Sequence, residues 1–230
     1  MMKYIALFLI GAITVQCWSQ EVSVGSLEDD TYLEDQFYLG VTYNLLLNKP
    51  TDITQRNLSY GLMGGIVKDI PLNADRNFGL GIGMGYALNS YYTNLFAEQV
   101  NGEIGYSGLT SNDNFRRSKL ETHVIELPLE IRWRNSNAID YKFWRVYAGG
   151  KLGYIFEGRS KFVDDNGKTG FTNPDIKKLQ YGLMLNVGYN TWNIHIYYAL
   201  SKLLEDGASL DTSELIQVKP LRIGIIFYIL

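Results

Sequence analysis

The chain has 230 residues with a formal net charge of -3, and 46% of them are hydrophobic. This length suits a single all-β domain, and the lack of a basic excess argues against nucleic acid as a partner. Cys17 is the one cysteine, so the chain cannot form a disulfide within itself.

Residues 1–19 follow the pattern of a secretory signal peptide, in which a lysine precedes an apolar run and a small residue ends the leader. Cleavage after Ser19 would leave Gln20 as the mature N-terminus. The apolar run is shorter than the roughly 20 residues that a membrane-spanning helix needs. Lipid attachment at Cys17 is an alternative, but the glutamine before it is not the small residue that such signals use. We therefore predict export with cleavage of the leader.

Residues 20–35 contain six acidic residues and no lysine or arginine. Such a segment buries too little apolar surface to fold, so we predict a disordered acidic tail in the periplasm. A docking segment for a basic partner is the alternative. The remaining residues, 36–230, are predicted to form one domain.

From residue 36 onward, apolar residues alternate with polar or small residues, which is the period of β-strands. Breaks in the alternation predict eight strands, at about 36–47, 57–69, 78–92, 119–134, 143–158, 177–189, 192–203 and 217–230. The connections at 93–117, 159–175 and 205–215 are long and are predicted to be loops, whereas most of the others are short. Long outer loops, short periplasmic turns and an even number of strands are typical of transmembrane β-barrels.

The strand at 78–92 begins FGLGIGMGYAL, with apolar residues at even positions and glycine or alanine at odd positions. Glycine weakens a strand, so the bare face is expected to accommodate bulky side chains from across the barrel. A dinucleotide-binding interpretation of the GxGxG pattern requires a following helix and a second strand that carries an acid. The sequence shows neither feature, and no cofactor is predicted.

Alternation does not by itself show whether the apolar face points into a core or out into lipid. A secreted lipocalin-like barrel, with its apolar face inward, is the alternative to a membrane barrel. Aromatic residues near the ends of apolar rows, both charge signs on the polar rows, and a C-terminal RIGIIFYIL that resembles the terminal signal of outer-membrane proteins favour the membrane. The predicted fold class is therefore all-β, an eight-stranded antiparallel up-and-down transmembrane β-barrel in the cell outer membrane.

Two sets of side chains follow from this facing. The predicted lipid-facing set is Leu127, Leu129, Ile131, Ile194, Ile196, Ile225 and Phe227. The predicted lumen polar network, in which acids and bases can pair, is Glu126, Glu130, Arg132, Arg145, Lys151 and Arg222. The facing of the strand at 57–69 is ambiguous. Pro128 cannot donate to the sheet and predicts a bulge or a local break.

Three stretches carry a resemblance to a known family: IELPLEIRWR at 125–134, YKFWRVYAGGKLGYIF at 141–156 and KLQYGLMLNVGYNTWNIHIYYAL at 178–200. They resemble the PorT-like outer-membrane β-barrel family of Bacteroidota, in which leaders that end in Ser-Gln are also habitual. The resemblance spans the predicted barrel and implies its architecture. The namesake of the family takes part in type IX secretion and gliding, most members have no assigned role, and the family defines no catalytic residue.

Some small outer-membrane barrels are lipid-modifying enzymes, so the two histidines need to be considered as catalytic residues. His123 lies two residues from Glu121, but no serine follows at short spacing and Ser118 has the other parity. His195 is predicted to face the lumen. A structural role fits both histidines better, because the geometry of a catalytic triad is missing. No residues have metal-ligand spacing, so neither an enzyme nor a metal site is predicted.

The interior of an eight-stranded barrel is just wide enough for side chains, so a diffusion pore is not expected. We predict a non-enzymatic envelope adaptor that contacts outer-membrane lipid and binds other envelope proteins through its long loops. The candidate partner-binding residues of loop 93–117 are Leu95, Phe96, Ile104, Tyr106 and Leu109. As an alternative, these residues fold back over the barrel mouth. A small transport or ligand-binding barrel is the second functional prediction, and a lipid-modifying enzyme is the third.

Overall fold

The computed structural model describes residues 36–55, 57–73, 75–110, 112–135 and 144–229. The predicted signal peptide, its cleavage site at Ser19 and Gln20, and the predicted acidic tail at 20–35 lie outside these ranges. No helix in the described ranges is long and apolar enough to cross a membrane.

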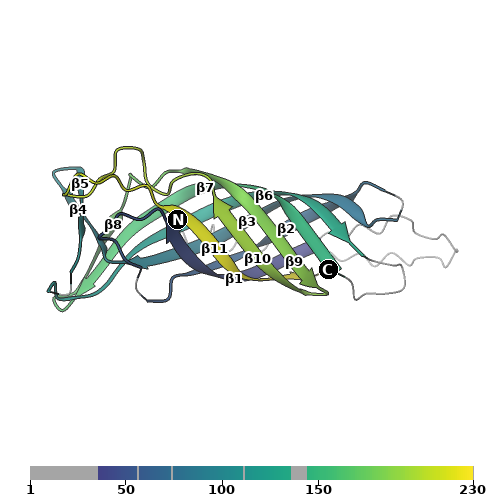
Figure 1. The fold of residues 1–230 in the computed structure, drawn as a ribbon, viewed down its shortest axis with the longest axis horizontal. Coiled ribbons are helices and arrows are strands. Elements are labelled where there is room, and N and C mark those ends of the chain that lie inside the picture. The colour runs from purple at the N-terminus through teal and green to yellow at the C-terminus, as the bar shows by residue number, and fades with distance from the viewer. Residues whose placement is uncertain (1–35, 56, 74, 111, 136–143, 230) are drawn as a thin grey trace, which may run out of the picture. The chain divides into compact units, whose positions relative to one another are not determined.

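Eight strands close into an antiparallel barrel (Figure 1). They are β1 (Gln36–Leu47), β2 (Tyr60–Pro71), β3 (Phe78–Thr93), β6 (Phe115–Arg134), β7 (Trp144–Asp164), β9 (Leu179–Tyr189), β10 (Trp192–Ala199) and β11 (Lys219–Ile229). Each pairs with the barrel strands before and after it in the chain, and β1 pairs with β11 to close the ring. The predicted fold class, an eight-stranded antiparallel up-and-down barrel, is confirmed.

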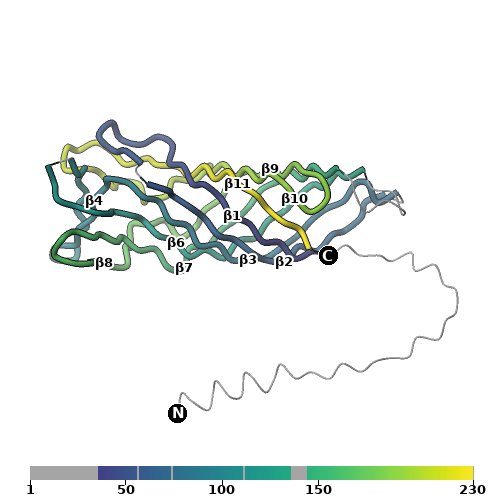
Figure 2. The backbone as a smooth tube through the Cα atoms, turned by 90° about the horizontal axis from the view of Figure 1, so that it is seen from below, coloured from purple at the N-terminus to yellow at the C-terminus, as the bar shows by residue number. Residues whose placement is uncertain are grey.

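Three shorter strands lie at one end of the barrel. β4 (Leu95–Val100) and β5 (Glu103–Gly108) form a hairpin, and β8 (Lys168–Thr172) pairs with the last part of β7. Figure 1 shows all three at the same end, and Figure 2 shows β4 and β8 there in a second view. We call this end the loop end. The opposite end, the turn end, carries short connections such as residues 190–191 between β9 and β10.

The connections at 93–117 and 159–175 are not the unstructured loops that the sequence predicted. Asn101 and Gly102 take positive φ values of 54° and 90°, which closes the β4–β5 hairpin in a turn that Asn-Gly favours. β7 runs on to Asp164, and a second Asn-Gly turn leads into β8. The prediction was wrong because it weighed the polar composition of these stretches above their Asn-Gly pairs.

The outer face of the barrel is apolar, as the predicted facing requires. Leu129, Ile131 and Ile194 of the lipid-facing set are 52%, 55% and 59% exposed, and the other four residues of that set are exposed or half-buried. In β2, whose facing was ambiguous, Ile66 is exposed and Val67 is buried. The odd-numbered residues of β2 therefore point into the lumen.

Aromatic side chains border the apolar face at both ends. At the turn end, the ring centroids of Trp144 and Tyr189 lie 5.6 Å apart, and toward the loop end those of His123 and Phe156 lie 6.0 Å apart. On β6, ten residues separate Trp133 from His123, which corresponds to ~25 Å along the membrane normal at ~3.3 Å per residue and a tilt of about 40°. That height matches the apolar band of outer-membrane barrels.

One β-bulge changes which residues of β7 face outward. The register of the β6–β7 pair shifts between His123 and Val124, which leaves Phe156 as an extra residue in β7. Beyond this bulge the side chains of β7 alternate with the opposite parity.

Pro128 causes a local break in the sheet, one of the two outcomes predicted for it. The pairing of β6 with β3 is interrupted there for two residues and resumes in the same register, so no bulge forms between these strands.

Candidate functional site

The loop end carries a folded head, which we define as the described residues 95–110, 112–121, 159–176 and 200–218. Backbone contacts join these segments although they are far apart in the chain. The amide of Asp211 donates to the carbonyl oxygen of Tyr106 at 2.9 Å, and Lys177 donates to Leu203 at 3.0 Å at the border of the head. The head is therefore one structured unit and not a set of free loops.

Tyr106 joins the β4–β5 hairpin to the rest of the head. Its hydroxyl donates to Asp175 at 3.0 Å and accepts from the side-chain amide of Asn173 at 3.0 Å. The ring is buried, and burial raises the pKa of Tyr106 above its usual range. The hydroxyl therefore stays protonated near neutral pH and can donate to Asp175 throughout that range.

The five candidate partner-binding residues divide into two groups. Leu95 and Tyr106 are only 3% exposed and belong to the hydrophobic core. Phe96, Ile104 and Leu109 are half-buried, and Ile104 packs against this core. Leu95 and Tyr106 thus fold back over the barrel mouth and offer no surface to a partner, whereas Phe96 and Leu109 keep part of theirs.

A cleft of about 460 Å³ lies in the head and is lined by residues of β4, β6, β7 and β8. Its aromatic lining is Phe96, Phe162 and Phe171, and the rings of Phe96 and Phe162 meet edge-on with centroids 4.7 Å apart. Lys119 and Lys161 add charged groups to the lining. We call this feature the head cleft. Glu98 and Asp164 also line the cleft, so it combines an aromatic patch with charged groups of both signs.

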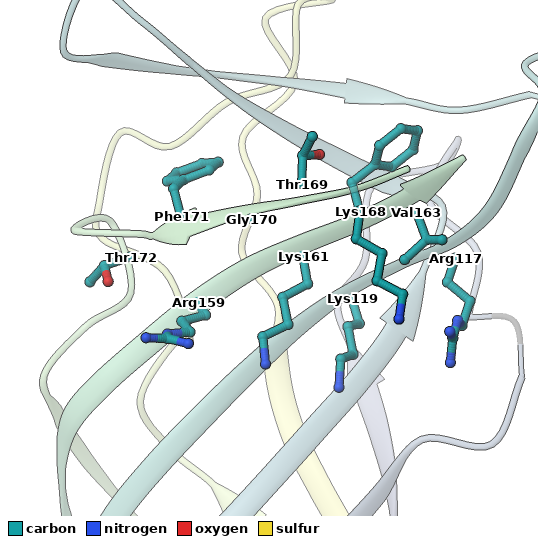
Figure 3. A pocket seen from close by; sticks show the side chains of 11 residues that line it. Arg117, Lys119, Arg159, Lys161, Val163, Lys168, Thr169, Gly170, Phe171 and Thr172 are labelled. Carbon is teal, nitrogen blue, oxygen red and sulfur yellow. The ribbon is translucent and has the colours of Figure 1, made fainter. Parts of the chain in front are cut away.

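A second hollow, of about 600 Å³, lies along β6, β7 and β8 (Figure 3). Its charged lining consists of Arg117, Lys119, Arg159, Lys161 and Lys168, and Figure 3 shows these five side chains extending to the same side of the sheet. We call these residues the basic cluster. The cluster was not predicted from the sequence because four of its members lie in the two stretches, 93–117 and 159–175, that were predicted to be loops.

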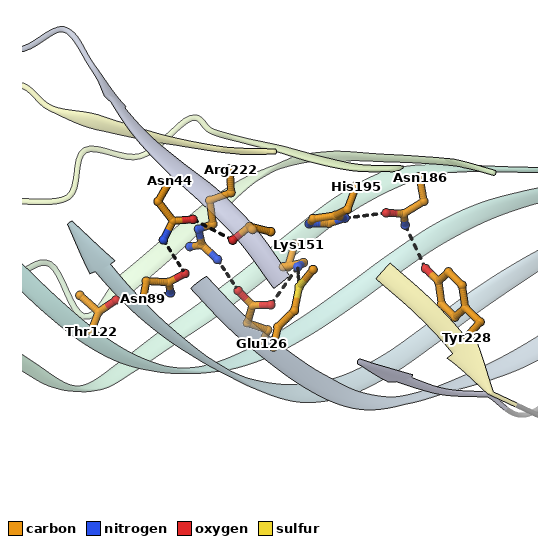
Figure 4. A network of polar contacts seen from close by, with 11 residues as sticks. Asn44, Asn89, Thr122, Glu126, Lys151, Asn186, His195, Arg222 and Tyr228 are labelled. Carbon is orange, nitrogen blue, oxygen red and sulfur yellow. Dashed lines mark hydrogen bonds and ion pairs between the residues drawn. The ribbon is translucent and has the colours of Figure 1, made fainter. Parts of the chain in front are cut away.

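In the middle of the lumen, Glu126 lies between two cations (Figure 4). Nζ of Lys151 donates to Glu126 Oε2 at 2.8 Å, and Nη1 of Arg222 donates to Oε1 at 2.7 Å. Glu126 is 1% exposed and both cations are 5% exposed. The Arg222 guanidinium also lies 4.5 Å from the ring centroid of Tyr197, in a cation–π contact. A buried charge is costly unless it is paired, so these groups stabilise the barrel as a set.

Toward the turn end, Arg132 lies between Glu130 and Asp69. Its Nε donates to Glu130 at 2.9 Å and its Nη1 donates to Asp69 at 3.1 Å, while Asp69 also accepts from Arg134 at 2.7 Å. Arg132 and Glu130 were predicted from the sequence to face the lumen but Asp69 was not, because the facing of β2 was ambiguous. The position of Asp69 two residues after the inward Val67 is the signal that would have identified it.

Arg145, the remaining member of the predicted lumen network, is buried opposite Arg134 in the β6–β7 register. All six predicted lumen residues are buried. The structure brings five of them together in two clusters, one around Glu126 and one around Arg132.

The glycines of β3 make room for bulky side chains in the lumen. A Cβ atom on Gly81 would lie 2.6 Å from Nε of Arg132, and a Cβ atom on Gly85 would collide with the hydroxyl of Tyr38. These side chains come from β6 and β1, close to β3 in the ring, and not from across the barrel as the sequence analysis expected. In a barrel this narrow, side chains of nearby strands already fill the axis.

The lumen ends in an apolar plug at the loop end. The plug consists of the buried side chains Leu120, Ile176, Leu203, Leu204, Leu210 and Ile216. Between the plug and the turn end, a cavity of about 10 Å³ lies beside Glu130 and His195. It has room for about one water molecule. In the described part of the barrel, packed side chains thus fill the lumen.

The two histidines occupy different environments. His123 lies on the outer face, with Nδ1 2.6 Å from the Tyr86 hydroxyl and Nε2 3.7 Å from Glu121. His195 lies in the lumen, with Nδ1 2.5 Å from Oδ1 of Asn186. In the described ranges neither ring is hydrogen-bonded to a serine hydroxyl, and no group of three acids, histidines or cysteines could hold a metal ion. Both histidines thus have contacts that suit a structural role.

Several solved structures are similar to this chain. Ail, the attachment invasion locus protein of Yersinia pestis, matches at 12% identity with a TM-score of 0.37, over 85% of this chain and 97% of that chain. Ail in complex with the heparin analogue sucrose octasulfate matches at 13% identity with a TM-score of 0.31, over 86% and 99%. A triple mutant of the Rhodopseudomonas blastica porin matches at 10% identity with a TM-score of 0.15, over 86% and 100%. A search of curated proteins finds no match.

The family comparison covers most of the chain. The sequence model of the family described as outer membrane protein beta-barrel domain matches residues 18–205, a range that includes β1 to β10. The closed eight-stranded ring, its apolar outer face and its two aromatic borders are the features expected of such a domain. The chain therefore belongs to the outer membrane protein beta-barrel domain family and is located in the outer membrane.

Proposed function

We propose that the protein is a non-enzymatic, non-conducting barrel that binds other envelope proteins through its head. The observation that carries this proposal is the contrast between a filled lumen and a head with an accessible cleft. Outer-membrane barrels carry short turns in the periplasm and long loops outside. By this rule, the loop end and its head face the exterior of the cell.

The head is the part of the barrel domain with free surface for a partner. The outer wall contacts lipid and the lumen is filled with ion pairs, whereas the head cleft presents Phe96, Phe162 and Phe171. Aromatic side chains are the usual anchors of protein interfaces. Because Tyr106 holds the hairpin that carries Phe96, the cleft is already formed before a partner binds, which lowers the entropic cost of binding.

The resemblance of residues 125–134, 141–156 and 178–200 to the PorT-like family leads to a finer proposal, a part in type IX secretion. In this proposal the signal peptide at residues 1–19 directs export. The acidic tail at 20–35 then offers a second protein contact in the periplasm. N-terminal sequencing of the mature protein tests the leader, and we expect the sequence to begin at Gln20.

A small transport or ligand-binding barrel is the alternative, and the lumen opposes it. The ion-pair clusters and the plug leave a cavity of about 10 Å³ beside Glu130 and His195. We therefore expect purified protein in a planar lipid bilayer to show no steady conductance. Reproducible open channels would contradict the closed lumen and favour the transport function.

The adaptor proposal is tested by changing the head cleft and leaving the fold intact. Phe96→Ser and Phe171→Ser each remove a half-buried anchor from the cleft. We expect both to abolish cross-linking of a specific envelope protein in intact cells, as identified by mass spectrometry. Val100→Ser is the matched control, because Val100 is exposed in the same hairpin but does not line the cleft.

Assembly of each variant is checked by its heat-dependent mobility on gels. Two results would contradict the adaptor proposal. One is a set of cross-linked proteins that is the same for the Phe96→Ser variant and the unchanged protein. The other is a lipid hydrolase activity of the purified protein that disappears in His123→Ala, which would favour an enzyme.

A further inference from the structure

The basic cluster continues the outer face of the barrel beyond the aromatic border. On β6, Arg117 and Lys119 are odd-numbered, as are His123 and the lipid-facing Leu129. From Arg117 to Leu129 the strand has no bulge of its own, so its side chains alternate without interruption. All four side chains therefore lie on the outer face. The cations stand directly above the surface that contacts lipid.

The bulge in β7 completes the cluster. Without the extra residue Phe156, Arg159 and Lys161 would have the parity of Lys151, which points into the lumen. With the bulge they face outward, and Lys161 lies opposite Lys119 in the β6–β7 register. Like charges directly opposite each other in a sheet repel. Anions beside the two lysines relieve this repulsion.

The protein itself supplies only part of that negative charge. Glu121 pairs with the lysines of β6 and β7, and Glu157 pairs with Arg159 at 2.5 Å. Arg117 and Lys168 are exposed, and neither forms an ion pair within the described residues. Five cations against two carboxylates leave an excess of three positive charges, on a chain whose formal net charge is -3.

The cluster spans the height of the lipid headgroups and the layer just beyond them. At ~3.3 Å per residue and a tilt of about 40°, Lys119 lies ~10 Å and Arg117 ~15 Å beyond His123 along the membrane normal. Arg159, opposite Glu121 in the β6–β7 register, lies ~5 Å beyond it. The headgroup region is roughly 5–8 Å deep on each side of the hydrocarbon core. Long lysine and arginine side chains can extend along the protein surface toward this layer and keep their charges within it.

We propose that the basic cluster binds the phosphate groups of lipid headgroups in the outer leaflet. Phosphate oxygens accept charge-assisted hydrogen bonds from arginine and lysine, and the hollow of about 600 Å³ can hold a headgroup. The position of the cluster above the lipid face favours a lipid over a soluble anion as the source of the phosphate. The inference does not require the proposed adaptor function. The two hollows share Lys119, Lys161 and Phe171 in their linings, so the test uses Arg117 and Lys168, which do not line the head cleft.

The test removes the two cations that have no carboxylate partner, so that no acid of the protein loses its pair. The full protein in a neutral detergent is titrated with dihexanoyl phosphatidic acid, and separately with dihexanoyl glycerol, which lacks the phosphate. Native mass spectrometry measures binding. We expect Arg117→Gln/Lys168→Gln to weaken phosphatidic acid binding ~30-fold, since each cation near an anionic lipid surface contributes roughly a factor of five.

Lys49→Gln/Lys178→Gln is the matched control, because it removes two exposed cations of the loop end that form no ion pair within the described residues and do not line the hollow. We expect it to bind phosphatidic acid as the unchanged protein does. Equal weakening in the two double variants would overturn the proposal, since it would show a general charge effect. Inorganic phosphate that binds as tightly as phosphatidic acid, with the same sensitivity to Arg117→Gln/Lys168→Gln, would overturn the lipid source and indicate a soluble anion.

Discussion

Glu121 and Glu126 lie on the same strand and each accepts from two cations, yet their surroundings differ. Lys151 and Arg222, the partners of Glu126, are enclosed in the lumen. The two lysines that bind Glu121 keep 17% and 34% of their side chains exposed and adjoin further cations. The same ion-pair pattern therefore stabilises the barrel where solvent is excluded, and leaves positive charge for a ligand where solvent enters. Burial, and not residue type, separates the two roles.

The largest effect is expected from Glu126→Ala, which leaves two cations in the lumen without their carboxylate. The free energy of unfolding should fall by about 3–5 kcal/mol, because an unmatched buried charge is strongly destabilising. Glu121→Ala is the matched change in the head and should cost ~1 kcal/mol or less, because its lysines reach water. Urea titration of the protein in lipid vesicles measures both values. Equal losses would show that burial does not separate the two sites.

A second comparison sets the lipid-facing wall against the head. Leu129→Arg places a charge at mid-membrane and should cost roughly 2–4 kcal/mol of unfolding free energy. Val100→Arg makes the same kind of change at an exposed position of the β4–β5 hairpin, where water hydrates the charge, and should be nearly neutral. The same titration applies to both variants. A neutral Leu129→Arg would mean that this wall does not contact hydrocarbon.

Glycines give a smaller contrast between the lumen and the head. A methyl group on Gly85 would meet the Tyr38 hydroxyl and the backbone of β2, so Gly85→Ala should destabilise the barrel by about 1–3 kcal/mol. No atom lies within 4 Å of the corresponding position at Gly105. Gly105→Ala should therefore be neutral or stabilise by up to about 1 kcal/mol. A destabilising Gly105→Ala would indicate that the hairpin packs more tightly than the structure shows.

The smallest effect concerns an exposed ion pair of the head. Hydrogen bonds from Lys177 and Lys202 lower the pKa of Asp206 from its ordinary value of 3.8 to about 2. A carboxylate whose pKa is lowered on folding stabilises the fold at pH values above its ordinary pKa. This contribution disappears as the pH falls from about 4 toward 2. NMR titration of the Asp206 carboxyl measures the pKa, which Lys202→Gln should raise. An unchanged value in this variant would exclude Lys202 as a cause.

More of the lumen site than of the head could be predicted from the sequence. Glu126, Lys151 and Arg222 lie at polar positions of strongly alternating strands, so their inward direction follows from period two. Asp69 was missed because both parities of β2 carry apolar residues. In the head, composition suggested loops where the Asn101-Gly102 pair closes a hairpin, and the burial of Tyr106 could not be foreseen because its partner Asp175 comes from a distant segment.

The sequence by itself determined the barrel, its outer membrane location and its two faces, because the direction of a side chain in a strand depends only on position along that strand. The tertiary structure decided which charges meet. Phe156 becomes a bulge only through the pairing of β7 with β6, and that bulge turns Lys161 outward to lie opposite Lys119. Strand register and bulges are set by residues far apart in the chain. The basic cluster is therefore a property of the pairing and not of either strand alone.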